Sequence, residues 1–249
     1  MNRPFGQDIS TELMKRLVAA IADQIRNPVA SIQAAMQVFN DQLARCNHGK
    51  DCGVADIQST MHQLISRVKR LDRYVGELSQ FAIPAVVRRR QFNLTSMIYD
   101  TVSEVRKETN GQVNFIYQPT SGDADCLGDP DLLGTALRAC IFNGVEAVDP
   151  AVKPELTLSW QCEDQEAWLE IRDNGPGFAA EVLASPIEPF HSTKEAGTGI
   201  GLSLAERNVK AHGGDVSLAN NSGGGAIVRI WFPFSERRPA SATKSNGGH

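Results

Sequence analysis

Residues 173–178 read Asp-Asn-Gly-Pro-Gly-Phe, and three related segments follow: Glu-Pro-Phe-His-Ser-Thr-Lys at 188–194, Gly-Thr-Gly-Ile-Gly-Leu at 197–202 and Ala-His-Gly-Gly at 211–214. Glycine accepts positive φ angles and lets the backbone come close to a ligand. A glycine turn that leads into a helix also presents free N–H groups and a positive dipole end to an anion. The stretch therefore predicts a nucleotide site, with the phosphates near residues 197–201.

A dinucleotide-binding fold is the competing interpretation of the second glycine cluster. That fold requires Gly-x-Gly-x-x-Gly directly after an apolar strand. The residues before Gly197 are His-Ser-Thr-Lys-Glu-Ala, which is typical of a loop, and the glycine spacing also differs. The ordered set of segments is much more specific than Gly-Thr-Gly-Ile-Gly alone, so the first interpretation is favoured.

The order of these segments closely resembles the ATP-binding catalytic domain of sensor histidine kinases, and the resemblance covers about residues 10–235. It implies that Asp173 accepts a hydrogen bond from the adenine amino group and that Gly175 and Gly177 shape the wall of the site. It also implies a mobile ATP lid around residues 190–196, followed by glycines on the phosphate side. The nucleotide-binding residues implied after Gly177 are Phe190, Thr193, Lys194, Gly197, Thr198, Gly199, Gly201 and Leu202.

Residues 143–147, Asn-Gly-Val-Glu-Ala, resemble the asparagine box of the same family. The resemblance implies that Asn143 binds Mg²⁺ bridging the phosphates, and a carboxamide oxygen suits this hard cation. ATP and Mg²⁺ are thus the implied cofactors. Ala139 replaces the first asparagine of the box and cannot act as the glutamate base of gyrase-like ATPases. Arg138 and Glu146 either reach the metal and phosphates or are ordinary surface charges of the helix.

Residues 21–32 resemble the phosphoacceptor box, which reads His-Glu-Ile-Arg-Asn-Pro-Leu-Ala-Ser-Ile in the family. Asp23 stands at the position of the phosphorylated histidine, and Gln24 replaces the acidic residue that assists proton removal. A neutral imidazole is a good nucleophile toward a phosphoryl group, whereas glutamine cannot accept a proton. We therefore expect no ordinary autophosphorylation at position 23. Whether Asp23 arose by natural divergence or by engineering stays open.

Asn27 is retained in this box, and the resemblance implies that it orients water for dephosphorylation of a response regulator. The alternative is that Asn27 caps a kink at Pro28. Two functions follow. One is a signalling protein that binds Mg-ATP, engages a response regulator and keeps phosphatase or regulatory activity. The other is a non-catalytic pseudokinase that forms a heterodimer with an active partner kinase and regulates it.

The fold class expected is α+β. Apolar residues recur every three or four positions over residues 13–39 and again over 54–81, which predicts an antiparallel helical hairpin. One hairpin cannot bury both apolar stripes, so we expect a homodimer with a four-helix bundle. The expected organisation is a hairpin at 1–83, a linker at 84–92, an ATP-binding two-layer α/β sandwich at 93–235 and a disordered tail at 236–249.

Within 93–235 the periodicity alternates between helix and strand. Asn93 is expected to cap a helix that runs to about Lys107, and Asp129 or Asp131 to start a second one. A third helix is expected over 200–211. Strands are expected at 112–118, near Cys126, at 156–160, 167–171, 216–218 and 226–232.

Composition and charge argue against several classes of protein. The 249 residues carry a net charge of −4 with a pI near 5.8, so no nucleic-acid footprint is expected. The short run Arg88-Arg89-Arg90 is interpreted as a solvated linker. No apolar run of about 20 residues is present, which argues against a membrane span, and no secretory signal precedes Ile9. Five scattered cysteines are typical of the reducing cytoplasm.

Overall fold

The computed structural model describes residues 25–26, 28–44, 54–120, 125–149, 152–185, 187–190, 192 and 199–234. These residues fall into two compact units. The first comprises the chain up to Ile83 together with Glu188–Ile200, and the second comprises Pro84–Ile187 together with the chain from Gly201 onward.

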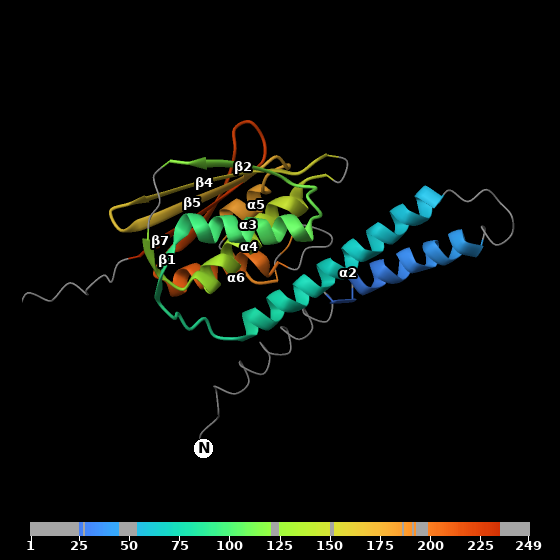
Figure 1. Ribbon diagram of the computed structural model, residues 1–249, viewed down its shortest axis with the longest axis horizontal. Coiled ribbons are helices and arrows are strands. Elements are labelled where there is room, and N and C mark those ends of the chain that lie inside the picture. The colour runs from blue at the N-terminus through green and yellow to red at the C-terminus, as the bar shows by residue number, and fades with distance from the viewer. Residues whose placement is uncertain are drawn as a thin grey trace, which may run out of the picture. The chain divides into compact units, whose positions relative to one another are not determined.

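The first unit contains a helix over residues 28–44 and helix α2, Val54–Ala82, which Figure 1 shows side by side. The helices are antiparallel, because Thr60 near the start of α2 donates to Gln42 at 3.1 Å while Arg67 farther along donates to Ser31 O at 2.8 Å. The predicted helical hairpin is therefore present. Among the described helices, none combines the length and the apolarity needed to cross a bilayer.

The second unit starts with an irregular segment, and strand β1, Arg90–Asn93, follows it. Strand β1 pairs antiparallel with β3, Asp125–Gly128. Residues 90–92, which we assigned to the linker, therefore form part of a folded element. The segment before β1 is also fastened to this unit, because the backbone N–H of Arg88 donates to Oδ2 of Asp129 at 2.9 Å.

A five-stranded mixed sheet forms one layer of the second unit. Its strand order is β2-β4-β5-β7-β6, where only the β2–β4 pair is parallel. Each strand occurs where the alternation of apolar residues predicts one. The strands are β2 Asn114–Pro119, β4 Glu155–Glu163, β5 Glu166–Asp173, β6 Asp215–Asn220 and β7 Ala226–Pro233.

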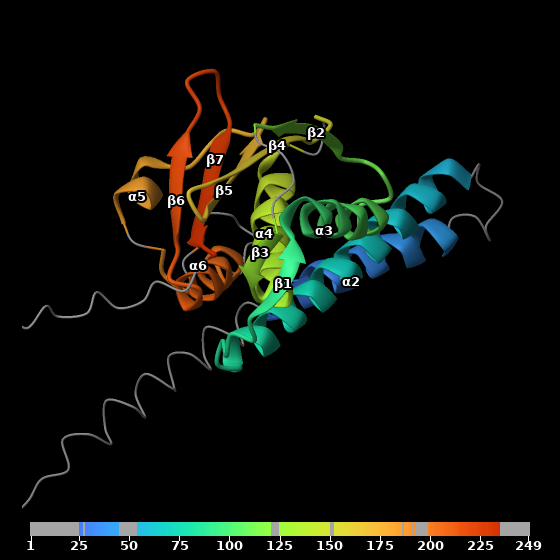
Figure 2. The same ribbon diagram turned by 60° about the vertical axis from the view of Figure 1, so that its left-hand side comes forward.

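Helices α3, Leu94–Glu108, α4, Pro130–Ala147, and α6, Gly201–Ala211, form the other layer, on one face of the sheet (Figure 2). Side-chain oxygens cap two of these helices, as predicted. Asn93 accepts from Ser96 N at 2.8 Å, and Asp129 accepts from the N–H groups of the first turn of α4. The short helix α5, Ala180–Ala184, was not predicted.

The core lies between the two layers and is continuous from α3 to the far strands. Among its fully buried residues are Ile98, Leu137, Leu156, Leu204 and Phe232. Helix α4 packs against both β4 and β5, and α6 packs against β6 and β7. The α+β class and the two-layer sandwich expected from the sequence are confirmed, and the packing of α4 on β5 is what positions the candidate site.

Candidate nucleotide site

Strand β5 ends with an acidic residue, Asp173. Its side chains alternate, so Ala167, Leu169, Ile171 and Asp173 all face the helices. Asp173 continues this apolar series and is only 8% exposed. A buried carboxylate is costly unless hydrogen bonds satisfy it, so its partners indicate how it is used.

Two backbone groups donate to the same oxygen of Asp173. Oδ1 accepts from Gly175 N at 2.9 Å and from Ala226 N at 3.0 Å. These bonds fix the orientation of the carboxylate from two elements, the loop after β5 and the first residue of β7. They leave Oδ2 as the oxygen available to a ligand, and a carboxylate can only accept there. Such a group selects a donor, such as an exocyclic amine.

The last turns of α4 approach this carboxylate closely. A Cβ added to Gly144 would lie 3.3 Å from Cβ of Asp173 and 3.0 Å from Leu156, and one added to Gly175 would lie 3.2 Å from Ala147 O. Glycine at both positions therefore allows α4 and the loop to meet. Asn143, which precedes Gly144, is half-buried in the same turn of α4. The structure thus brings the asparagine box and Asp173 together.

Asn174 and Asn220 hold the loop of residues 174–178, and sequence reasoning missed both. Asn174 accepts from Glu155 N at 2.9 Å and donates to Lys153 O at 3.2 Å. Asn220 accepts from Phe178 N at 2.7 Å and donates to Phe178 O at 2.9 Å. Asn174 lies inside the quoted motif and could have been suspected. Asn220 is 42 residues from Phe178, and no local pattern points to that contact.

Gly177 explains why the loop can lie so close to Asn220. Its φ is +85°, and an added Cβ would lie 2.8 Å from Asn220 Oδ1. Both the left-handed backbone and the short distance exclude a larger residue without a shift of the loop. Gly175 and Gly177 therefore have separate spatial reasons to be glycine, one facing α4 and the other facing β6.

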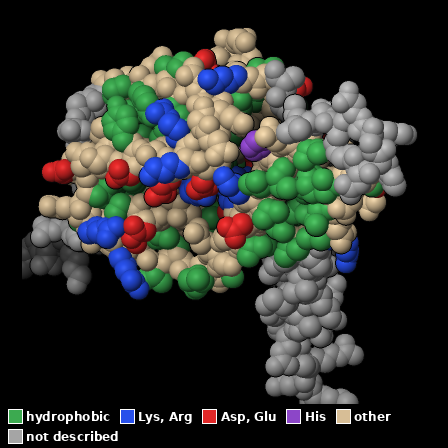
Figure 3. Space-filling model, turned by 45° about the vertical axis from the view of Figure 1, so that its right-hand side comes forward, with side chains coloured by type: hydrophobic (Ala, Val, Ile, Leu, Met, Phe, Trp, Pro, Cys, Tyr) green, Lys and Arg blue, Asp and Glu red, His purple; other side chains and the backbone are tan. Residues whose placement is uncertain are grey.

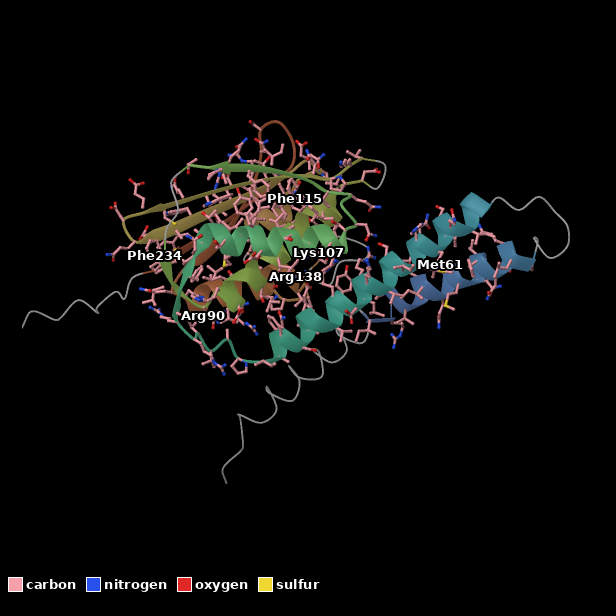
Figure 4. The ribbon with its side chains drawn as sticks, viewed as in Figure 1. Met61, Arg90, Lys107, Phe115, Arg138 and Phe234 are labelled. Carbon is pink, nitrogen blue, oxygen red and sulfur yellow. The ribbon has the colours of Figure 1, made fainter. Side chains whose placement is uncertain are left out.

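The charged residues of α4 divide into different roles. Arg138, labelled in Figure 4, points to α3, where its guanidinium makes two bonds to Glu108, at 2.5 and 2.8 Å. It also lies over the ring of Phe142, with 4.8 Å to the centroid. These contacts agree with the interpretation of Arg138 as a surface charge of the helix. Glu146 is half-buried on the same helix as Asn143.

Helix α6 begins at Gly201, and Leu202 packs against the core. Its C-terminus follows the glycine pattern, because Gly213 has a φ of +81° and Gly214 N donates to Val209 O at 3.1 Å. A Cβ on Gly214 would lie 2.0 Å from Trp231 O, so α6 closes tightly against β7.

The other site residues named from the sequence either belong to the first unit or lie outside the described residues. Phe190 and Gly199 belong to the first unit, where Phe190 N donates to Gly199 O at 3.1 Å and the Phe190 ring packs edge-on against Phe81. Seven residues named from the sequence lie outside the described part of the chain: Asp23, Gln24, Asn27, Thr193, Lys194, Gly197 and Thr198.

The residues present fit a magnesium-bound adenine nucleotide. The described part of the chain contains no group of three His, Cys, Asp or Glu side chains that could enclose a metal ion. Mg²⁺ usually keeps several waters and binds through few protein ligands plus substrate phosphates. One carboxamide, that of Asn143, near the buried carboxylate of Asp173, suits that mode of binding.

The chain is similar in sequence to several known proteins. Residues 128–236 match the family described as histidine kinase-, DNA gyrase B-, and HSP90-like ATPase. The signal transduction histidine-protein kinase AtoS of Escherichia coli (strain K12) is 26% identical over 88% of this chain and 34% of its own length. Sporulation kinase C of Bacillus subtilis (strain 168) is 26% identical over 89% of this chain and 49% of its own. The chain thus spans about a third to a half of these relatives.

Solved structures share the fold. Histidine kinase ThkA, in complex with response regulator protein TrrA, matches with a TM-score of 0.67 and 17% identity over 94% of this chain and 66% of that one. Full-length ShkA in complex with AMPPNP matches with a TM-score of 0.58 and 18% identity over 84% and 46% of the two chains. At 17% and 18% identity these two structures show that the fold is shared, and the family model matches residues 128–236 of this chain.

Proposed function

We propose that this chain is a two-component signalling protein that binds Mg-ATP and engages a response regulator, without ordinary autophosphorylation at position 23. The observation that carries the nucleotide part is the orientation of Asp173. Its Oδ1 is held by Gly175 N and Ala226 N, so Oδ2 is the oxygen that would accept from the adenine amino group. The bound AMPPNP in the related ShkA structure supports this choice of ligand.

Asn143 would hold the Mg²⁺ ion that neutralises the phosphates, through its side-chain oxygen. Gly175 and Gly177 would form the wall beside the base. The proposal also retains the residues implied on the phosphate side, which are Phe190, Thr193, Lys194, Gly197, Thr198, Gly199, Gly201 and Leu202. ATP and Mg²⁺ are therefore the proposed cofactors.

The hairpin would serve as the surface for a response regulator. The ThkA structure contains the response regulator TrrA, which supports a partner of that class. Asp23 and Gln24 lack the imidazole and the base that phosphotransfer requires, whereas Asn27 could still orient a water for dephosphorylation. The expected outcome is a protein biased toward phosphatase or regulatory action in the cytoplasm.

A second candidate function is a pseudokinase that forms a heterodimer with an active histidine kinase. The exposed apolar residues of the hairpin favour a helical partner in either case, since they include Met36, Met61, Ile65, Val68 and Val75. A homodimer through this surface is our proposal for the isolated chain. The two functions differ in whether the chain acts on a regulator alone or only beside a partner kinase.

Calorimetric titration of the purified chain with ATP and Mg²⁺ tests the nucleotide proposal. Asp173→Asn keeps an oxygen for the two backbone donors and replaces Oδ2 with an amide, so ATP affinity should fall by about ten- to a hundredfold. Asp215→Asn, at an exposed carboxylate on β6, is the matched control and should bind ATP as the wild type does. Equal affinity of Asp173→Asn and wild type would refute the assignment.

Radiolabelled ATP tests the phosphotransfer proposal. No label should appear on the isolated chain, and label on it would contradict the predicted loss of autophosphorylation. A phosphorylated response regulator should lose its label in the presence of the chain, and Asn27→Ala should abolish that loss. Label loss that requires an added kinase would favour the pseudokinase instead.

A further inference from the structure

The side-chain amide of Asn220 makes two hydrogen bonds to the backbone of Phe178. Phe178 N donates to its Oδ1 at 2.7 Å, and its Nδ2 donates to Phe178 O at 2.9 Å. This pair of bonds reproduces what a neighbouring strand would do, so it fixes both the position and the orientation of the loop end. Phe178 is the residue directly after the glycine motif, 42 positions away in the chain.

The partner of Asn220 in the sheet holds the other end of the same loop. Asn220 is the last residue of β6, and it pairs in register with Ala226, the first residue of β7. The N–H of Ala226 donates to Oδ1 of Asp173 at 3.0 Å. One cross-strand pair therefore contacts the loop at both of its boundaries, Asp173 at the start and Phe178 at the end.

Close approach at both points depends on glycine. A Cβ on Gly177 would lie 2.8 Å from Asn220 Oδ1, and a Cβ on Gly225 would lie 1.9 Å from Asp173 O. Both residues also have left-handed φ angles, of +85° and +92°. The end of the β6–β7 hairpin and the loop are therefore in direct contact. Phe178 packs against the core, whereas the middle of the loop, Gly175, Pro176 and Gly177, contributes little side-chain packing.

Resting on the proposed function, we propose that Asn220 is a positioning residue for adenine recognition. It holds the loop of residues 174–178 against β6, so that Gly175 N stays on Oδ1 of Asp173 and Oδ2 stays turned toward the base. Without the amide, the two glycines around Pro176 gain conformational freedom. The carboxylate then loses one of its two fixed donors for part of the time, and with it the fixed direction of its free oxygen.

Base preference separates this role from a merely structural one. Adenine presents an amine where guanine presents a carbonyl, so a correctly oriented carboxylate favours ATP and repels GTP. A variant that only destabilised the domain would weaken both nucleotides alike or neither. A variant that releases the carboxylate should lose ATP affinity while GTP affinity changes little, so the preference for ATP shrinks.

The experiment measures the dissociation constants of ATP and GTP, each with Mg²⁺, for the wild-type chain, Asn220→Ala and Asn221→Ala. Circular dichroism first establishes a temperature at which all three are folded. Asn221 is the matched control, because it serves the same turn through backbone bonds, Asn221 N to Gly225 O and Gly224 N to Asn221 O. If Asn220→Ala does not fold, Asn220→Asp, which keeps the oxygen facing Phe178 N, is measured in its place.

We expect Asn220→Ala to bind ATP about tenfold more weakly and to lose about the same factor in preference for ATP over GTP. Asn221→Ala should match the wild type. An unchanged preference in the Asn220 variant, beside a wild type that binds ATP, overturns the positioning role and leaves the proposed function standing. A wild type that binds no ATP refutes the proposed function itself, so the two failures are distinguishable.

Discussion

Nε2 of His212 accepts a hydrogen bond from the backbone N–H of Asp129 at 3.0 Å, although the two residues are 83 positions apart. On the other side of the ring, Nδ1 lies 2.7 Å from Asn208 O. Because a carbonyl only accepts and an N–H only donates, the ring must carry its proton on Nδ1 and be neutral. Asp129 also caps α4 and accepts from Arg88 N, so this neutral ring supports the start of α4 in the second unit.

This arrangement makes folding stability sensitive to acid. Burial lowers the pKa of His212, and the carbonyl of Asn208 and the charge of Asp129 oppose that effect, whereas Arg89 adds to it. Below pH ~6.5 the unfolded chain binds a proton that the folded ring resists. The free energy of unfolding should therefore be highest above that pH and should fall by up to ~1.4 kcal/mol per pH unit as the pH decreases through 6.

Urea unfolding at pH 7.5, 6.5 and 5.5 measures this effect. His212→Gln should reduce the loss of stability between the first and last pH, whatever its effect at pH 7.5. His62→Gln, at an exposed histidine of α2, is the control and should keep the wild-type pH dependence. The same loss in His212→Gln as in the wild type would contradict the assignment.

Two adjacent glycines in the turn before β7 should differ sharply in their tolerance of alanine. Gly224 and Gly225 have φ angles of +96° and +92°, so each substitution strains the backbone about equally. A Cβ on Gly224 meets nothing within 4 Å, whereas one on Gly225 would lie 1.9 Å from Asp173 O. Gly224→Ala should cost about 1 kcal/mol, and Gly225→Ala a further 1–3 kcal/mol or more, in the free energy of unfolding.

Denaturant unfolding of the two glycine variants gives the comparison directly, and calorimetry with ATP adds a second measurement. Gly225→Ala moves the carboxylate of Asp173 and should weaken ATP binding, while Gly224→Ala should leave it unchanged. Equal stabilities of the two variants would show that the contact between the turn and Asp173 is looser than the structure has it.

Three described cysteines should resist alkylation in the folded protein. Burial raises the pKa of Cys140 to about 12 and also raises the pKa values of Cys126 and Cys162, whose thiols are hydrogen-bonded to each other. The thiolate is the reactive form, so at pH 8 Cys140 should react about a thousandfold more slowly than a free thiol. Mass spectrometry after iodoacetamide treatment, with and without denaturant, should find these three modified only when the chain is unfolded.

The elements with regular side-chain periodicity could be predicted from the sequence, and so could the helix caps Asn93 and Asp129. Strand β1 could not, because Arg-Gln-Phe-Asn neither alternates nor is apolar, and its pairing with β3 comes from tertiary contacts. In the site, the motif at residues 173–178 was enough to predict Asp173, Gly175 and Gly177. The contacts of Asn220 with Phe178 and of Ala226 with Asp173 join residues 42 and 53 positions apart, which only the register of β6 and β7 brings together.

The surface of the helical hairpin carries a repeat of exposed apolar side chains. Met61, Val68 and Val75 recur every seven residues along α2 and are 40%, 51% and 45% exposed, whereas Leu64 is buried. Figure 3 shows apolar side chains gathered over this hairpin. A seven-residue repeat of exposed apolar side chains is the pattern by which helices associate in bundles. Val68→Glu should therefore weaken self-association of the chain at least tenfold, because it would bury a charge against a second copy.

Analytical ultracentrifugation over a range of concentrations checks this. Gln63→Glu adds the same charge on the opposite side of α2, at an exposed polar position, and should leave the dimer intact. A wild type that stays monomeric at all concentrations would refute the homodimer and turn attention to a heterodimer with a partner kinase. Only Val68 lies on the apolar repeat. Equal weakening by the two substitutions would therefore show that the added net charge, and not the apolar surface, is responsible.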